Sequence, residues 1–166
     1  TEQGPATSEL EPASSPKKVM VVGGGPAGMA AARIAALRGP PVSMFEKTGS
    51  LGGMLGFASM VKGPHENLDD PAAYLERQLE IAGVNVTLNK EVDQALIDSE
   101  APDAVILAVG GTRTKLDVSG GVPVIDFDSF MTADKGENVV VYGPYSQAFD
   151  CALWLNVRKK HVPIRT

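Results

Sequence analysis

A glycine-rich stretch near the N-terminus has the spacing of a dinucleotide-binding turn, G-x-G-x-x-G, and directly follows a short apolar run. In such a turn the first glycine permits a tight strand-to-helix connection, and the second lets a pyrophosphate approach the backbone. The third glycine lets the helix pack closely on the strand, and the positive end of that helix favours phosphate. The residues predicted to bind a pyrophosphate are Gly23, Gly25, Pro26, Ala27 and Gly28.

An acidic residue follows this turn at the distance expected for ribose recognition. Glu46 lies 18 residues after Gly28, at the end of a second apolar run. A carboxylate at this position accepts hydrogen bonds from a ribose diol. The alternative is a structural glycine turn with an unrelated surface glutamate, and the strand, turn and helix pattern around the motif argues against it.

Two further glycine clusters follow at positions where backbone amides could reach a cofactor. Gly52 and Gly53 come shortly after Glu46, and Gly110 and Gly111 end another apolar run. Ligands of open parallel sheets bind beyond the carboxyl ends of the strands, which is where these clusters are expected. A flexible surface loop and an ordinary turn after a strand remain the alternative interpretations.

A second, weaker version of the same motif lies near the C-terminus. Gly143 and Ala148 fit its first and last positions, but Tyr145 stands where the second glycine would allow phosphate to approach. Two interpretations of this motif remain: an NAD(P)-binding site, or a structural turn that keeps the fold without binding a nucleotide.

The elements around these motifs predict an α/β, Rossmann-like domain with a mostly parallel sheet, followed by the start of a second βαβ unit. We expect strands at 19–22, 42–46, 84–89 and 104–109, and a short strand at 122–125. The 104–109 strand is continuously apolar, which is typical of a strand buried on both faces. Helices are expected at 29–38 and from an Asp70 cap, with Pro71 in its first turn, to Gly83. Residues 48–63 are expected to be a loop. The later unit is predicted as a strand at 139–143, a helix at 147–159 and a strand beginning at 162.

Composition limits the function classes. The chain has 166 residues, 43% of them hydrophobic, and a net charge of −5, which disfavours a nucleic-acid-binding protein. No apolar run approaches the length of a membrane span. One cysteine and two histidines exclude a Cys/His metal site within this sequence, and a cytoplasmic location is the default expectation. Cys151 is expected to be a buried residue that packs in the core, and His65 is expected to lie in a loop. The predicted division is a disordered tail or linker at 1–16, a nucleotide-binding domain at 17–136 and an incomplete second unit at 137–166.

The glycine clusters, in this order and spacing, resemble the first dinucleotide-binding domain of two-domain flavoprotein oxidoreductases. The sequence around them is similar to the FAD/NAD(P)-binding part of the 2,4-dienoyl-CoA reductase, enoate reductase and trimethylamine dehydrogenase family. The stretches that carry this similarity are Tyr74–Glu80, Gly83–Asn89 and Ala148–Ala152.

The resemblance implies an FAD-binding domain of an NAD(P)H-dependent flavoprotein oxidoreductase, with other domains such as a barrel that holds FMN and an iron–sulfur cluster. It places Lys47 beside the ribose, Met54 with Gly53 near the pyrophosphate, and the Val92 backbone against adenine. Ala108, Gly110 and Gly111 are then expected to pass close to the cofactor. Met54 departs from the glutamine usual in the family. The alternative function is a non-catalytic module that binds only ADP, as in trimethylamine dehydrogenase-like proteins. We assign no catalytic residue in this sequence.

Overall fold

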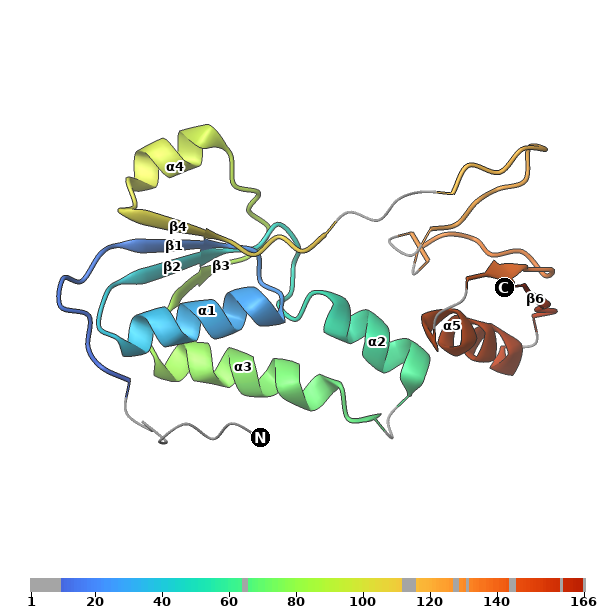
Figure 1. Ribbon diagram of the computed structural model, residues 1–166, viewed down its shortest axis with the longest axis horizontal. Coiled ribbons are helices and arrows are strands. Elements are labelled where there is room, and N and C mark those ends of the chain that lie inside the picture. Colours follow the sequence, from blue (N-terminus) through green and yellow to red (C-terminus); the bar gives the residue numbers. More distant parts are fainter. Residues whose placement is uncertain are drawn as a thin grey trace. The chain divides into compact units, whose positions relative to one another are not determined.

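The computed structural model describes residues 10–63, 66–111, 116–126, 129–130, 132–143, 146–158 and 160–165 (Figure 1). The chain divides into two compact units. The first contains residues 1–56 and 68–110, and the second contains residues 57–67 and 111–166. The predicted limits of 17–136 and 137–166 stay a prediction. Residues 10–16 form no helix or strand, and the Ala13 N–H donates to the Arg38 carbonyl at 2.9 Å.

A four-stranded parallel sheet forms the centre of the first unit. It consists of β1 (Val19–Val22), β2 (Val42–Phe45), β3 (Asn85–Thr87) and β4 (Ala104–Leu107), in the order β3-β2-β1-β4. Each neighbouring pair of strands runs parallel, and consecutive residues of one strand pair with consecutive residues of the other. The predicted α/β, Rossmann-like fold is therefore confirmed.

Two helices cover one face of this sheet. They are α1 (Pro26–Leu37) and α3 (Asp69–Ile81), which lie side by side beneath the strands in Figure 1. Alternate strand residues point toward them because successive side chains of a strand face opposite sides. The fully or nearly fully buried core that results contains Val19, Val21, Met29, Ala32, Val42, Met44 and Leu79.

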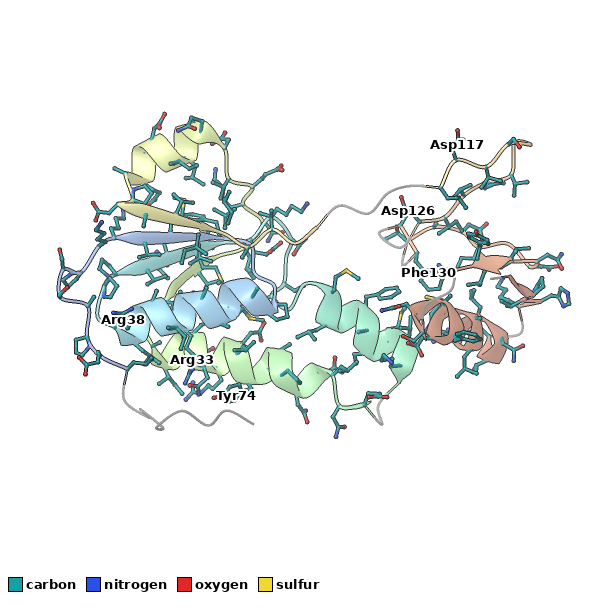
Figure 2. All side chains as sticks on the ribbon, viewed as in Figure 1. Arg33, Arg38, Tyr74, Asp117, Asp126 and Phe130 are labelled. Carbon is teal, nitrogen blue, oxygen red and sulfur yellow. The ribbon has the colours of Figure 1, made fainter. Side chains whose placement is uncertain are left out.

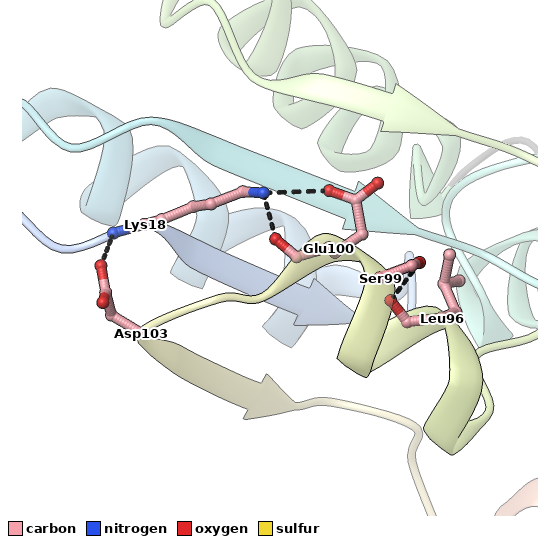
Figure 3. A network of polar contacts seen from close by, with 5 residues as sticks. All are labelled: Lys18, Leu96, Ser99, Glu100 and Asp103. Carbon is pink, nitrogen blue, oxygen red and sulfur yellow. Dashed lines mark hydrogen bonds and ion pairs between the residues drawn. The ribbon is translucent and has the colours of Figure 1, made fainter.

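A short helix on the other side of the sheet is fixed to β1 by polar contacts. This helix, α4 (Gln94–Glu100), begins at Asp93, whose side chain accepts the Leu96 N–H at 2.8 Å. The Lys18 ammonium contacts both the carbonyl and the carboxylate of Glu100, and the Lys18 N–H donates to Asp103 at 2.7 Å (Figure 3). These contacts connect the starts of β1 and β4, which lie 85 residues apart in sequence.

The predicted loop at 48–63 is wrong, because it contains helix α2 (Met54–Lys62). Phe57 and Val61 are four residues apart and both are buried, so one apolar face stabilises the helix. Glycines before and within the helix hid this pattern. The start of α3 also differs, since the helix begins at Asp69 with Leu68 as its N-cap, and Asp70 provides no side-chain cap.

Strand β4 is exposed, although its apolar sequence predicted burial on both faces. Val105 is 38% exposed and Leu107 is 72% exposed, whereas Ile106 packs against the core between them. Among the described residues β4 pairs with β1 alone, so its other edge has no neighbour there. The strand predicted at 122–125 is absent from the structure as well, and those residues have no regular structure.

The second unit contains the predicted order of strand, helix and strand. Strands β5 (Val141–Tyr142) and β6 (Ile164–Arg165) pair in parallel, and α5 (Ser146–Val157) connects them. Aromatic packing supports its core, because Phe130 (Figure 2) meets Phe57 and Trp154 edge to face at centroid distances of 5.6 and 5.4 Å. The buried residues of this core are Phe57, Val61, Phe130, Cys151 and Leu155.

Candidate nucleotide-binding site

The four parallel strands of the first unit end at the same edge of the sheet. Val22 is in register with Phe45 on one side and with Leu107 on the other, and Phe45 is in register with Thr87. The residues that follow these strands therefore come together, although they are far apart in sequence. The Gly23 N–H donates to the Phe45 carbonyl at 2.9 Å, and the Ala108 N–H donates to the Val22 carbonyl at 2.8 Å.

Two glycines of the first motif are required for packing. Gly23 has a φ of +106°, and a Cβ placed on it would lie 2.8 Å from the carbonyl carbon of Ala108. A Cβ on Gly28 would overlap the carbonyl oxygen of Gly23 and lie 3.3 Å from the Ala108 Cβ. Neither position accepts a side chain without movement of the backbone, which is the role expected of the first and third glycines.

Gly25, by contrast, has open space around it. No atom lies within 4 Å of a Cβ built there, and its φ of −74° is available to any residue. Gly25 is also the N-cap of α1, with no side-chain cap and no acidic residue in the first turn. The first N–H groups of a helix have no partner within the helix, so the exposed turn at Pro26 and Ala27 is suited to an anion.

The second glycine cluster packs directly on this turn. The Gly52 N–H donates to the Gly24 carbonyl at 2.9 Å, and a Cβ on Gly53 would lie 3.1 Å from the Gly25 Cα. Both glycines have positive φ values, +102° and +52°. Met54 begins α2 directly after them and is 45% exposed. The structure thus brings Gly52 and Gly53 beside the predicted phosphate turn.

Glu46 connects the same turn to the end of β2. One carboxylate oxygen accepts the Gly24 N–H at 2.6 Å, and the other accepts the N–H and the hydroxyl of Thr48, each at 2.8 Å. Partial burial opposes ionisation of Glu46. The hydrogen bonds from Gly24 and Thr48, together with the charge of Lys47, outweigh that effect, so the pKa of Glu46 is lowered. The carboxylate is therefore ionised and held at the edge where a ribose is expected.

The remaining predicted residues lie at different distances from this centre. Lys47 is exposed beside Glu46, and Val92 is half-buried just after Lys90, whose N–H donates to the Glu46 carbonyl at 2.9 Å. Ala108 packs on Gly23, as described above. Gly110 follows in the same unit, whereas Gly111 is the first residue of the other unit after β4.

Two contributors to the site were not predicted from the sequence. Gly24 donates to Glu46 and accepts from Gly52, and a Cβ on it would overlap the Leu51 side chain. The run of three glycines at 23–25 was a signal for its role. Thr48 supplies two donors to Glu46, and no sequence pattern marks it.

A nearby cavity contains none of the predicted cofactor residues. Its volume is about 470 Å³, and its lining is Gly49, Ser50, Leu51, Glu76, Leu79, Glu80, Val84, Val86 and Leu88. It lies between α3 and the outer edge of β3, rather than at the glycine turn.

The second motif is only partly described. A Cβ on Gly143 would contact the Ala148 Cβ at 3.5 Å, so the two ends of the motif lie together. Tyr145 and His65 lie outside the described residues. Cys151 is buried, as predicted, and burial together with the Asp150 charge raises the pKa of its thiol to about 11.

Two features are absent from the part of the chain that the structure describes. That part holds no group of three or more His, Cys, Asp or Glu side chains suited to a metal ion. None of the helices in the same residues has the length and apolar character needed to cross a membrane.

The fold and this edge of the sheet define a dinucleotide-binding domain of the doubly wound α/β class. The sequence model of the FAD dependent oxidoreductase family matches residues 18–113, and the chain belongs to this family. This membership confirms the resemblance to FAD-dependent enoate reductases and trimethylamine dehydrogenase-like flavoproteins.

Known proteins of several activities are similar to the chain. Cinnamate reductase of Clostridium sporogenes is 37% identical over 161 residues, which are 93% of this chain and 24% of that protein. NADH oxidase of Thermoanaerobacter brockii is 39% identical over 82% of this chain and 22% of its own length. The structure of 2-naphthoyl-CoA reductase with 2-naphthoyl-CoA is 31% identical, with a TM-score of 0.84, over 93% of this chain and 24% of that one. The chain thus spans about a quarter of the length of these relatives.

Proposed function

We propose that this chain binds the ADP half of FAD at the glycine turn and serves as the FAD-binding domain of a larger NAD(P)H-dependent flavoprotein oxidoreductase. The observation that carries this proposal is the convergence of three separate segments on one uncapped helix start. Gly24 is hydrogen bonded both to Glu46 and to Gly52, while Gly25 leaves open space in front of α1. Nothing acidic in the first turn of α1 opposes a pyrophosphate there.

The chain's own groups have distinct roles in this proposal. Backbone N–H groups at the start of α1, near Ala27, donate hydrogen bonds to the pyrophosphate oxygens, with Gly52 and Gly53 beside them. The ionised Glu46 accepts the ribose hydroxyls, and the backbone at Val92 lies toward the adenine. When bound, FAD supplies the hydride and electron chemistry, and the protein supplies position and electrostatics.

For the whole protein we propose a hydride from NAD(P)H as the source of electrons, which then pass to another redox centre. The similarity to the NADH oxidase of Thermoanaerobacter brockii supports NAD(P)H as the electron donor. Relatives four times as long support further domains, and we propose that these include a barrel with FMN and an iron–sulfur cluster. The substrate class suggested by the cinnamate and 2-naphthoyl-CoA reductases is an unsaturated acid or acyl thioester.

A second candidate is a module that binds ADP without flavin. One observation favours this module: all the groups assigned to the site are placed to bind phosphate, ribose or adenine, and none to bind the flavin ring. Competition of FAD against labelled ADP separates the two functions. Much tighter binding of FAD, with flavin absorbance retained after gel filtration, supports the flavin-binding domain. Equal affinity, together with no flavin retained by the full-length protein, supports the ADP module.

Calorimetric titration of the full chain with ADP tests the site itself. We expect Gly25→Val to abolish binding without loss of the fold, because its side chain would fill the open space in front of α1. Replacement of Glu46 by Ala should weaken the binding of ADP by about 1–3 kcal/mol, the contribution of a hydrogen bond to a charged group. Gly56→Ala, in helix α2 with open space around it, is the matched control. Wild-type affinity in Gly25→Val would place the phosphate site elsewhere.

A further inference from the structure

The hydroxyl of Thr48 has two acceptors within hydrogen-bond distance. Its Oγ1 lies 2.8 Å from the Glu46 Oε1 and 3.0 Å from the Ser50 carbonyl oxygen. A threonine hydroxyl carries a single proton, so it donates to one of these oxygens at a time. The side chain therefore has two hydrogen-bonded arrangements that differ only by rotation of the hydroxyl.

Glu46 has little capacity left for a ribose while the Thr48 hydroxyl donates to it. An ionised carboxylate offers about four lone-pair positions. Three donors within the protein already hydrogen bond to the Glu46 carboxylate, namely the Gly24 N–H, the Thr48 N–H and the Thr48 hydroxyl. A ribose diol brings two more donors, so one internal donor must leave if both ribose hydroxyls are to bind Glu46.

The Thr48 hydroxyl is the donor that can leave without moving the backbone. Gly24 is fixed by the bond between its carbonyl and the Gly52 N–H, at 2.9 Å. The Thr48 backbone is fixed in the same way by the Asn89 N–H, which donates to the Thr48 carbonyl at 2.9 Å. The hydroxyl, in contrast, rotates about one bond and meets the Ser50 carbonyl.

We infer that the Thr48 hydroxyl donates to the Glu46 carboxylate before a nucleotide binds, and that it rotates to donate to the Ser50 carbonyl when a ribose diol binds. Thr48 is a positioning residue in this sense, since it acts on the ribose through Glu46. The inference rests on the proposed function, because it assumes that the ligand is a ribonucleotide bound at Glu46.

The electrostatics of Glu46 provide a readout that structural support alone would not change. Burial raises its pKa, while the bonds from Gly24 and from both groups of Thr48, with the charge of Lys47, lower it. Lys47 is the charged group that acts on Glu46 among the described residues. Loss of the hydroxyl should therefore raise the pKa of Glu46 only in states where the hydroxyl donates to it.

The test is an NMR titration of the Glu46 carboxyl carbon in the full chain, compared between wild type, Thr48→Val and Thr48→Ser. Each protein is measured alone, saturated with ADP and saturated with 2′-deoxy-ADP. We expect Thr48→Val to raise the pKa of Glu46 in the free chain and to leave it unchanged in the ADP complex. The 2′-deoxy-ADP complex should behave like the free chain, because one ribose hydroxyl fits the remaining acceptor position. Thr48→Ser should match wild type throughout.

Several results would overturn the exchange. A rise of the pKa in the ADP complex of Thr48→Val would show that the hydroxyl stays on Glu46, and no rise in the free chain would show that it never donates there. The affinity of Thr48→Val for ADP should equal or slightly exceed that of wild type, so a tenfold loss also contradicts the exchange. Failure of wild type to bind ADP would refute the proposed function and the exchange with it. The free-chain titration would still report the Thr48–Glu46 bond by itself.

Discussion

Replacement of Gly28 by alanine tests whether the turn is as tightly packed as the structure indicates. In most helices this substitution stabilises, by up to about 1 kcal/mol, because alanine has the higher helix propensity. Here the added Cβ would overlap the carbonyl oxygen of Gly23 and lie 3.3 Å from the Ala108 Cβ. A Cβ cannot rotate away, so the turn itself must move. Overpacking of this kind costs about 1–3 kcal/mol, and backbone displacement belongs at the upper end of that range.

We therefore expect Gly28→Ala to lower the free energy of unfolding by about 2 kcal/mol net of the propensity gain. Urea denaturation followed by circular dichroism is the assay. Gly56→Ala is the matched control, because Gly56 lies within α2 and a Cβ there meets no atom within 4 Å. That control should stabilise the chain by about 0.5–1 kcal/mol. If Gly28→Ala were as stable as wild type, the close packing of α1 on the Gly23 turn would be refuted.

Three further predictions concern other residues. The pKa of Glu46 is lowered in the folded chain, so its contribution to stability is present above the ordinary value of 4.5 and is lost as pH falls through the lower folded value. The stability difference between wild type and Glu46→Gln should thus be present at neutral pH and shrink in acid, and a pH-independent difference in urea denaturation would contradict this. Because the pKa of the buried Cys151 thiol is raised to about 11, iodoacetamide at mildly alkaline pH should label the folded chain far more slowly than the urea-unfolded chain. Equal labelling rates would show that the thiol is accessible. Ala101 ends α4 with a φ of +45°, so Ala101→Gly should stabilise by about 0.5 kcal/mol, after the entropy of glycine in the unfolded chain is allowed for. Ala95→Gly, inside the same helix, should destabilise by about 1 kcal/mol instead, and thermal denaturation compares the two.

Local patterns in the sequence were sufficient for the elements that carry the glycine turn. The apolar runs of β1 and β2 and the alanine-rich α1 are continuous signals, and the glycine spacing joins them in one unit. Helix α2 was missed because Gly52, Gly53 and Gly56 suggested a loop, while its helical signal came from only two buried positions, Phe57 and Val61. Helix α4 has seven residues and none of them is buried, so it has almost no hydrophobic periodicity to detect.

Burial and hydrogen-bond partners depend on segments that meet only in three dimensions. The apolar sequence of β4 predicted burial, but exposure is decided by what covers the strand, and Leu107 is 72% exposed. The position of Glu46 followed from spacing alone. Its partners Gly24 and Thr48 did not, because a sequence pattern does not show which donors a carboxylate meets after the chain has folded.

The pairing of β1 with β4 has a consequence for the order of folding. The two strands begin 85 residues apart, and closing so long a loop costs chain entropy before their contacts compensate for it. Ala108, which packs on Gly23, arrives only with β4. The glycine turn is therefore completed late, and on the ribosome it must wait until residue 108 has emerged. A nucleotide that binds only the finished turn stabilises the folded unit, and it should slow unfolding to the extent that the turn is lost in the transition state.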